Sequence, residues 1–154
     1  MMKGAVFATR GCPHNCRYCN LKQIYHNCFR TRPVKDVVEE IRRLPSRFFV
    51  FWDDNLFADV DYAKKLFLAI APYKRKWAAQ ATLRDCKDEE LLALAKAAGC
   101  IYLFIGLESF SEASLSDAGN ITNLLIPLFP SFLPWYYHNV LLVQLNKSEM
   151  YSYF

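Results

Sequence analysis

The chain has little of two features that would place it in common functional classes. It has no long run of Lys or Arg: its 154 residues carry a net charge of +4, so the charge pattern gives no clear signal for nucleic-acid binding. Residues 1–4 lead directly into an apolar segment, without the basic and then apolar stretch of an export signal. We therefore expect a cytoplasmic protein in which the six cysteines are reduced.

Charge is also absent from one segment near the C-terminus. Residues 121–145 contain no Asp, Glu, Lys or Arg, and Pro127, Pro130 and Pro134 interrupt this apolar stretch. Proline breaks helices, so the segment is not a convincing membrane span. We predict a domain over residues 1–119 and an aberrant apolar tail over residues 120–154, packed as irregular or short helical structure against the open side of the domain. A frameshift, or a fusion to an unrelated reading frame, would also produce this break in pattern.

What the chain does contain is an alternation of strand and helix patterns. Apolar runs predict four strands, over residues 5–9, 48–52, 77–81 and 101–105. Amphipathic patterns predict helices between them, over residues 33–44, 59–71 and 88–98. Apolar strands that alternate with amphipathic helices are typical of an α/β fold in which helices cover a parallel sheet.

Polar side chains follow each of these strands. Because the carboxyl ends of parallel strands meet at one edge of a sheet, we expect these side chains to form a site there. In chain order they are Cys12, Cys16 and Cys19; Asp53, Asp54 and Asn55; Gln80 and Thr82, which flank the end of the third strand; Glu108 and Ser109.

Three of the cysteines have a spacing typical of metal ligands. Cys12, Cys16 and Cys19 form a CxxxCxxC motif on one short loop. A closed structural site has four protein ligands, whereas three leave one metal position open for a substrate or cofactor. The alternatives are a zinc site completed by His14, His26 or Cys28, and three unconnected thiols. We expect Cys86 and Cys100 to be small core residues.

The loop sequence GCPHNCRYC, with Tyr18 before the last cysteine, resembles the cluster loop of the radical SAM enzymes. The resemblance implies that Cys12, Cys16 and Cys19 hold a 4Fe–4S cluster whose fourth iron binds the amino and carboxylate groups of S-adenosylmethionine. Reductive cleavage of S-adenosylmethionine would then give a 5′-deoxyadenosyl radical. It also implies an electron donor, such as a flavodoxin or ferredoxin.

Two further segments carry the resemblance. Residues 51–57, FWDDNLF, resemble the FxDDxF-type segment of the subgroup often fused to a cobalamin-binding domain, which implies that residues 53–55 lie near the amino group of S-adenosylmethionine. Residues 105–109 resemble the segment that meets the ribose, with Glu108 as the first candidate and Ser109 as the second. Gln80 is a weaker candidate, as are Thr82 and Arg84. A simple turn at residues 53–55 and a helix N-cap at Ser109 remain the structural alternatives.

The resemblance covers residues 4–118 and implies a truncated, TIM-like partial barrel with about four of the family's six βα units. The function it implies is radical SAM chemistry on an unidentified small molecule, which this subgroup extends to cobalamin-assisted methyl transfer through a domain absent from these residues. The alternatives are a non-catalytic zinc-binding interaction module and an inactive fragment of a radical SAM gene.

Overall fold

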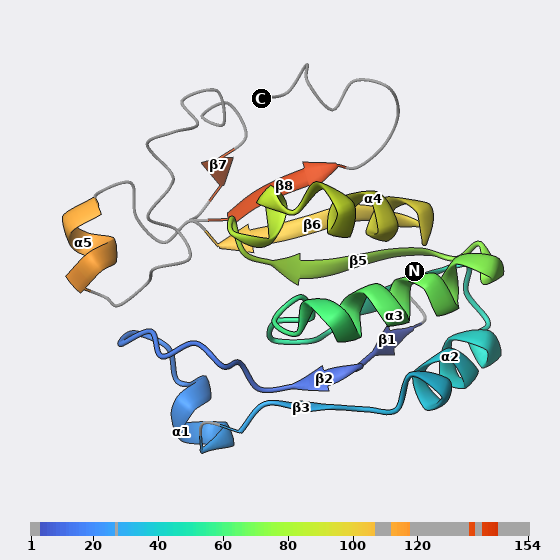
Figure 1. The fold of residues 1–154 in the computed structure, drawn as a ribbon, viewed down its shortest axis with the longest axis horizontal. Coiled ribbons are helices and arrows are strands. Elements are labelled where there is room, and N and C mark those ends of the chain that lie inside the picture. The colour runs from blue at the N-terminus through green and yellow to red at the C-terminus, as the bar shows by residue number, and fades with distance from the viewer. Residues whose placement is uncertain (1–3, 27, 107–111, 118–135, 138–139, 145–154) are drawn as a thin grey trace.

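The computed structural model describes residues 4–26, 28–106, 112–117, 136–137 and 140–144. Its main sheet has the strand order β1-β4-β5-β6-β8-β7 (Figure 1). The first four of these strands run parallel and follow one another in chain order. They are β1 (Ala5–Val6), β4 (Phe48–Phe51), β5 (Lys76–Ala81) and β6 (Cys100–Gly106). The predicted parallel sheet is therefore confirmed, and its carboxyl ends lie at the left in Figure 1.

A main helix lies within each of the three connections between the parallel strands. These helices are α2 (Val34–Arg43), α3 (Val60–Ile70) and α4 (Glu89–Ala97), with short 3₁₀ turns η1 (Ala71–Tyr73) and η2 (Asp85–Lys87) beside the last two. Helix α3 contacts both α2 and α4. Asp59 and Asp88 begin α3 and α4, since their side chains accept hydrogen bonds from the backbone N–H groups of Tyr62 and Leu91 at 3.0 and 2.9 Å. The predicted alternation thus forms one layer of helices against a parallel sheet.

The core between the sheet and the helices is rich in aromatic rings. Trp77 of β5 is fully buried, with its ring 5.2 Å from that of Phe51 and 5.1 Å from that of Phe67. Its indole N–H donates to the backbone carbonyl of Ala98 at 3.0 Å, so the polar atom of this large side chain is satisfied. This core fixes the sheet that carries the polar segments.

The sequence patterns did not predict three short elements that surround the cysteine loop. Strands β2 (Thr9–Arg10) and β3 (Arg30–Thr31) pair antiparallel, and helix α1 (Leu21–Tyr25) lies between them in the chain. Elements of two and five residues are too short to show a hydrophobic period. Because β3 pairs with β2, the two ends of the segment that carries the cysteines lie side by side.

The structure corrects one expectation for the tail. Residues 136–137 and 140–144 form strands β7 (Tyr136–Tyr137) and β8 (Val140–Gln144), not irregular or helical structure. Strand β8 pairs antiparallel with β6 from Tyr102 to Gly106, so it is not a further parallel strand of a barrel. The edge of β6 offers unpaired backbone groups, and the apolar run of β8 satisfies them. The other residues of the tail lie outside the described part of the chain. Helix α5 (Glu112–Asp117) precedes the tail.

Among the described residues, no helix has both the length and the apolar character needed to cross a bilayer.

The aromatic core gives a test of the fold. Phe67 has no exposed surface, and Phe67→Ala should lower the free energy of unfolding by about 3–5 kcal/mol through lost burial and a cavity. Its neighbour Leu68 is 60% exposed, so Leu68→Ala should change that free energy by less than about 0.5 kcal/mol. Urea unfolding measures both, and equal effects would contradict this packing.

Candidate metal centre

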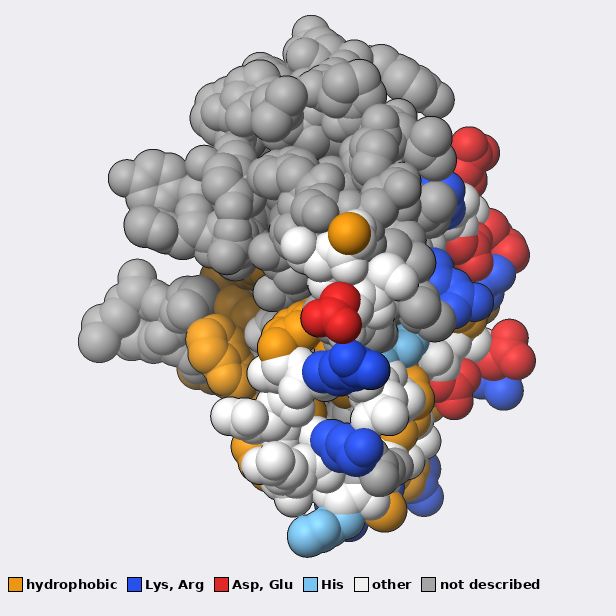
Figure 2. All heavy atoms as spheres, turned by 90° about the vertical axis from the view of Figure 1, so that its left-hand side faces the viewer, with side chains coloured by type: hydrophobic (Ala, Val, Ile, Leu, Met, Phe, Trp, Pro, Cys, Tyr) orange, Lys and Arg blue, Asp and Glu red, His pale blue; other side chains and the backbone are white. Residues whose placement is uncertain are grey.

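The cysteine loop leaves the sheet beside the segment that follows β4. The parallel pairing of β1 with β4 ends with a hydrogen bond from the Trp52 backbone N–H to the Val6 carbonyl at 2.8 Å. Beyond this point the side chains of residues 53–55 make the hydrogen bonds to the segment that follows β1. Figure 2 shows the face at which the strands end, where Lys and Arg side chains lie among mainly uncharged atoms.

Asp53 anchors the start of the loop. Its side-chain oxygen Oδ1 accepts hydrogen bonds from the Ala8 backbone N–H at 3.0 Å, from the Thr9 hydroxyl at 2.7 Å and from the Thr9 backbone N–H. Asp53 is only 1% exposed, and this burial raises the pKa of its carboxyl group to about 6, against the opposing effect of the Thr9 and Ala8 donors. The carboxyl group therefore fixes the backbone where the loop begins.

Asp54 holds the next part of the loop. Its Oδ2 atom accepts a hydrogen bond from the Gly11 backbone N–H at 3.1 Å. Gly11 has a φ of +84°, and a Cβ atom there would lie 2.2 Å from the carbonyl oxygen of Cys28. Only glycine fits this close approach between the two ends of the cysteine-containing segment.

Asn55 reaches the first cysteine itself. Its side-chain amide nitrogen donates to the sulfur of Cys12 across 3.7 Å. The other end of this amide, Oδ1, is buried, as is Oδ2 of Asp53, and neither has a hydrogen-bond partner among the described residues. Buried acceptors without partners are costly, so both atoms are free to accept from a bound group.

The three cysteines of the loop are half-buried free thiols near one another. Burial raises the pKa of Cys12, and the charges of Cys19 and Asp54 add to this, against hydrogen bonds from the His14 backbone and Asn55. Burial also raises the pKa of Cys16, and Cys12 and Cys19 add to it, against a hydrogen bond from Tyr18. The thiols are thus close enough to repel one another when ionised, a situation that a bound cation relieves.

The donor set suits a thiolate-bound metal centre, because three neighbouring sulfur ligands are present on one loop. Within the described ranges, however, no three His, Cys, Asp or Glu side chains stand in the arrangement of a formed metal site. The same finding covers the zinc alternative, in which His14, His26 or Cys28 would complete the site. Cys28 is exposed, and His26 ends α1 with a φ of +51°.

The end of β5 also reaches the loop. Asp85 accepts hydrogen bonds from the backbone N–H and the hydroxyl of Thr82, both at 2.7 Å, so Thr82 is a turn residue here. Burial raises the pKa of Asp85, while Thr82 and the nearby charge of His14 oppose this. The loop that carries His14 therefore lies near the turn after β5.

The remaining candidates are less closely placed. Gln80 is exposed on β5 and is paired in register with Phe104 of β6. Glu108 and Ser109 lie outside the described residues. Cys86 and Cys100 pack with the hydrophobic core, and burial raises the pKa of Cys86 to about 12.

Sequence reasoning overlooked how residues 53–55 contact the loop. Their assignment to a bound cofactor stays a prediction, and in the structure their side chains also bind the chain around the cysteines. It also missed Thr9 as a partner of Asp53. The signal was present, because polar residues that directly follow β4 must lie beside the segment that follows its neighbour β1.

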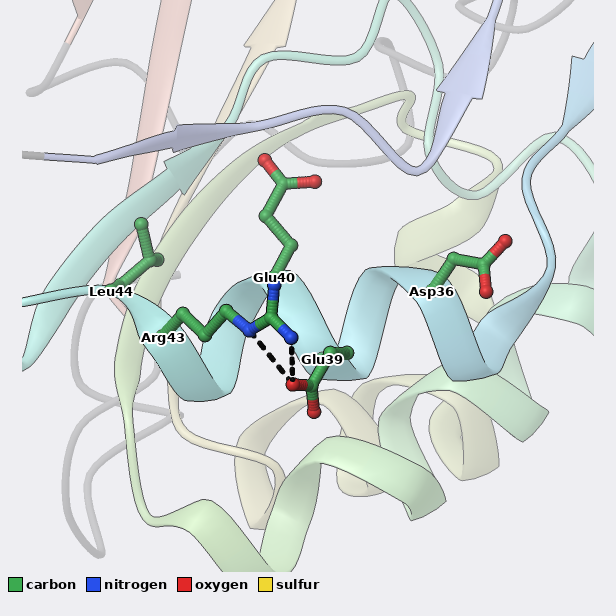
Figure 3. Close-up of a pocket in the computed structure, with 5 residues that line it drawn as sticks. All are labelled: Asp36, Glu39, Glu40, Arg43 and Leu44. Carbon is green, nitrogen blue, oxygen red and sulfur yellow. Dashed lines mark hydrogen bonds and ion pairs between the residues drawn. The ribbon is translucent and has the colours of Figure 1, made fainter.

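A depression of about 430 Å³ on α2 is a separate feature and not a site of this kind (Figure 3). Two of its carboxylates are already in ion pairs, Glu39 with Arg42 and Arg43, and Glu40 with Arg32. Figure 3 shows Arg43 directed toward Glu39, while Glu40 points away from both. The hydrogen bond from Arg42 lowers the pKa of Glu39 to about 2.

The buried Asp53 carboxyl predicts a pH dependence of stability. Its folded pKa of about 6 exceeds its ordinary value of 3.8, so the folded state binds this proton more tightly. The preferential binding of this proton stabilises the folded state by up to about 3 kcal/mol. This stabilisation is fully present below a pH of 3.8 and is lost as the pH rises through about 6. Asp53→Asn removes this titration. The free energy of unfolding of the wild type minus that of Asp53→Asn should therefore fall between about pH 4 and about pH 7.

Urea unfolding across this range measures that difference. The exposed Asp61 of α3 provides a control, because Asp61→Asn should leave the pH dependence as in the wild type. A constant difference between the wild type and Asp53→Asn would show that the carboxyl is not desolvated.

Comparison with known proteins gives a consistent result. The model of the radical SAM superfamily matches residues 6–124. The chain is 34% identical over 119 residues to cytidylyl-2-hydroxyethylphosphonate methyltransferase of Streptomyces wedmorensis, covering 74% of this chain and 22% of that protein. It is 29% identical over 126 residues to bacteriochlorophyllide d C-12(1)-methyltransferase of Chlorobaculum tepidum, covering 78% of this chain and 28% of the relative. The chain thus spans about a quarter of the length of these relatives.

Solved structures show the same fold. The radical S-adenosylmethionine methyltransferase TsrM of Kitasatospora setae, solved with cobalamin and a [4Fe–4S] cluster bound, superposes with a TM-score of 0.68 at 21% identity. The match covers 73% of this chain and 22% of TsrM. The four parallel strands and their helices therefore correspond to part of the TsrM fold. With the family model matching most of the chain, these findings show that the protein belongs to the radical SAM superfamily.

Proposed function

We propose that this chain is the amino-terminal part of a radical SAM catalytic domain that binds a 4Fe–4S cluster through Cys12, Cys16 and Cys19. The observation that supports the proposal is the loop itself, whose three neighbouring free thiols are held against the sheet by the side chains of residues 53–55. Three protein ligands would leave one iron open for S-adenosylmethionine. When bound, the cluster supplies the electron that cleaves S-adenosylmethionine to methionine and a 5′-deoxyadenosyl radical.

The protein's own residues would prepare the site in two ways. Burial and mutual proximity keep the apo thiols of Cys12 and Cys16 protonated, so cluster binding releases protons and relieves the cost of desolvating thiolates. The buried oxygens Asn55 Oδ1 and Asp53 Oδ2 are acceptors beside the loop and suit the ammonium group of S-adenosylmethionine. Gln80, Glu108 and Ser109 remain proposed contacts to the rest of this cofactor.

The surroundings of the loop support an electron donor of acidic character. Arg10 lies over the ring of Phe7 at 3.3 Å, and Arg17 pairs with Asp117 on the exposed surface. Together with Lys22 and Arg30 these residues make the rim basic, which would attract an acidic flavodoxin or ferredoxin. We propose a cytoplasmic location, because reduced thiols and such a donor are typical of that compartment.

Methyl transfer is the reaction that the relatives favour. The two curated relatives described above and TsrM are all methyltransferases by name, and TsrM binds cobalamin. We propose a cobalamin-assisted methylation of a small molecule, with cobalamin held by a domain outside these residues. Because the chain spans so little of its relatives, the complete site would include further segments of the catalytic domain.

Iron analysis tests the cluster proposal. Cys16→Ala in the anaerobically reconstituted chain should lose most of the bound iron and the brown charge-transfer absorption, because one of three ligands is removed. Cys28→Ser is the matched control: its thiol lies off the loop motif and is exposed, so iron and sulfide should remain at the wild-type level.

Two results would count against the proposal. A full iron complement in Cys16→Ala would show that this thiol is not a ligand. Bound zinc that is lost in Cys28→Ser would instead favour the four-ligand interaction module.

A further inference from the structure

Residues 53–55 contact the cysteine loop in the same order along the chain. Asp53 binds Ala8 and Thr9, Asp54 binds Gly11, and Asn55 binds Cys12, so successive residues of one segment contact successively later positions of the other. The contacts continue the parallel pairing in which Ala5 is opposite Val50 and Val6 is opposite Phe51. Side chains thus replace the backbone ladder where the two strands end.

The last of these contacts is the hydrogen bond from the Asn55 amide to the sulfur atom of Cys12. Asn55 is only 3% exposed, and the residues after it, Leu56 and Phe57, are fully buried. The backbone carbonyl of Asn55 also accepts from the Ala58 N–H at 3.4 Å, which closes a turn. The amide therefore has little freedom to leave Cys12.

The orientation of the amide follows from charge. A thiolate is an acceptor, so the NH₂ end of the amide is attracted to it and the carbonyl end is repelled. Asn55 Oδ1 has no partner in the described part of the chain, so no competing donor there would turn the amide around. A cluster-bound sulfur would keep this arrangement, because it carries negative charge and hydrogen bonds to charged groups are the stronger ones.

We propose that Asn55 is a positioning residue for Cys12, which donates an N–H···S hydrogen bond to the cluster-ligating sulfur and raises the reduction potential of the cluster. This inference rests on the proposed function, since it assumes that Cys12 is a cluster ligand. Reduction adds negative charge to the cluster and its sulfur ligands, and a donor aimed at one ligand stabilises that reduced state. Cys12 thereby becomes electronically distinct from Cys16, which lies beside Tyr18 instead.

The test is a redox titration of the anaerobically reconstituted full chain, followed by electron paramagnetic resonance. Asn55→Leu keeps a similar volume and removes the donor. We expect it to disfavour reduction about tenfold, which for one electron is a shift of ~59 mV toward negative potential. Asn55→Asp, which replaces the donor with an anion, should shift the potential further in the same direction.

Gln23→Leu is the control, because it removes an amide from the exposed face of α1 and should leave the potential unchanged. Iron and sulfide content is measured for every variant. A wild type without a cluster would overturn the proposed function and this inference together. A wild-type cluster with the same potential in Asn55→Leu and Asn55→Asp would overturn only the inference.

A second measurement uses the wild type, so it does not depend on the folding of a variant. Pulsed electron paramagnetic resonance of the reduced wild type, labelled with ¹⁵N in the asparagine side chains, should show a nitrogen coupled to the cluster. Its absence would overturn the inference. Its loss in Asn55→Leu, with the coupling unchanged in Gln23→Leu, would assign the nitrogen to Asn55.

Discussion

The interaction on which the site depends is the buried carboxyl group of Asp53. This side chain is almost wholly removed from water, and its Oδ1 atom gathers the backbone N–H groups of Ala8 and Thr9 and the Thr9 hydroxyl. A buried carboxyl is costly unless it is hydrogen-bonded, so the position is tolerable only while the chain after β1 stays in place. The same contact therefore joins the two strands at their carboxyl ends and fixes the start of the cysteine loop.

The rest of the loop is built outward from this anchor. Asp54 and Asn55 extend the contacts to Gly11 and Cys12, while the pairing of β2 with β3 returns the chain to the sheet. The aromatic core beneath, with Phe51, Phe67 and Trp77 in contact, makes the sheet a firm support. The cysteines thus stand on a loop whose ends are held in place, as a preorganised ligand site would need.

The strand direction of the main sheet changes at β6. Four parallel strands match part of TsrM, and on the far side of β6 the chain places β8 in the opposite direction. An antiparallel strand satisfies the backbone groups of an exposed edge as well as a parallel one does, but it does not continue a βα barrel. The described residues therefore form a parallel sheet with an antiparallel border.

The sequence alone determined the alternation of strands and helices, because long amphipathic and apolar patterns such as residues 33–44 and 48–52 report burial directly. It also identified the cysteine motif, since ligand spacing on one loop is a local property. Short elements were beyond it: β2, β3 and α1 show no period, and the pairing of β8 depends on an edge that only the folded sheet presents. Only the tertiary structure decided the part played by residues 53–55. Their contacts to Ala8, Thr9, Gly11 and Cys12 join segments more than 40 positions apart, and they arise because parallel pairing brings the ends of β1 and β4 together.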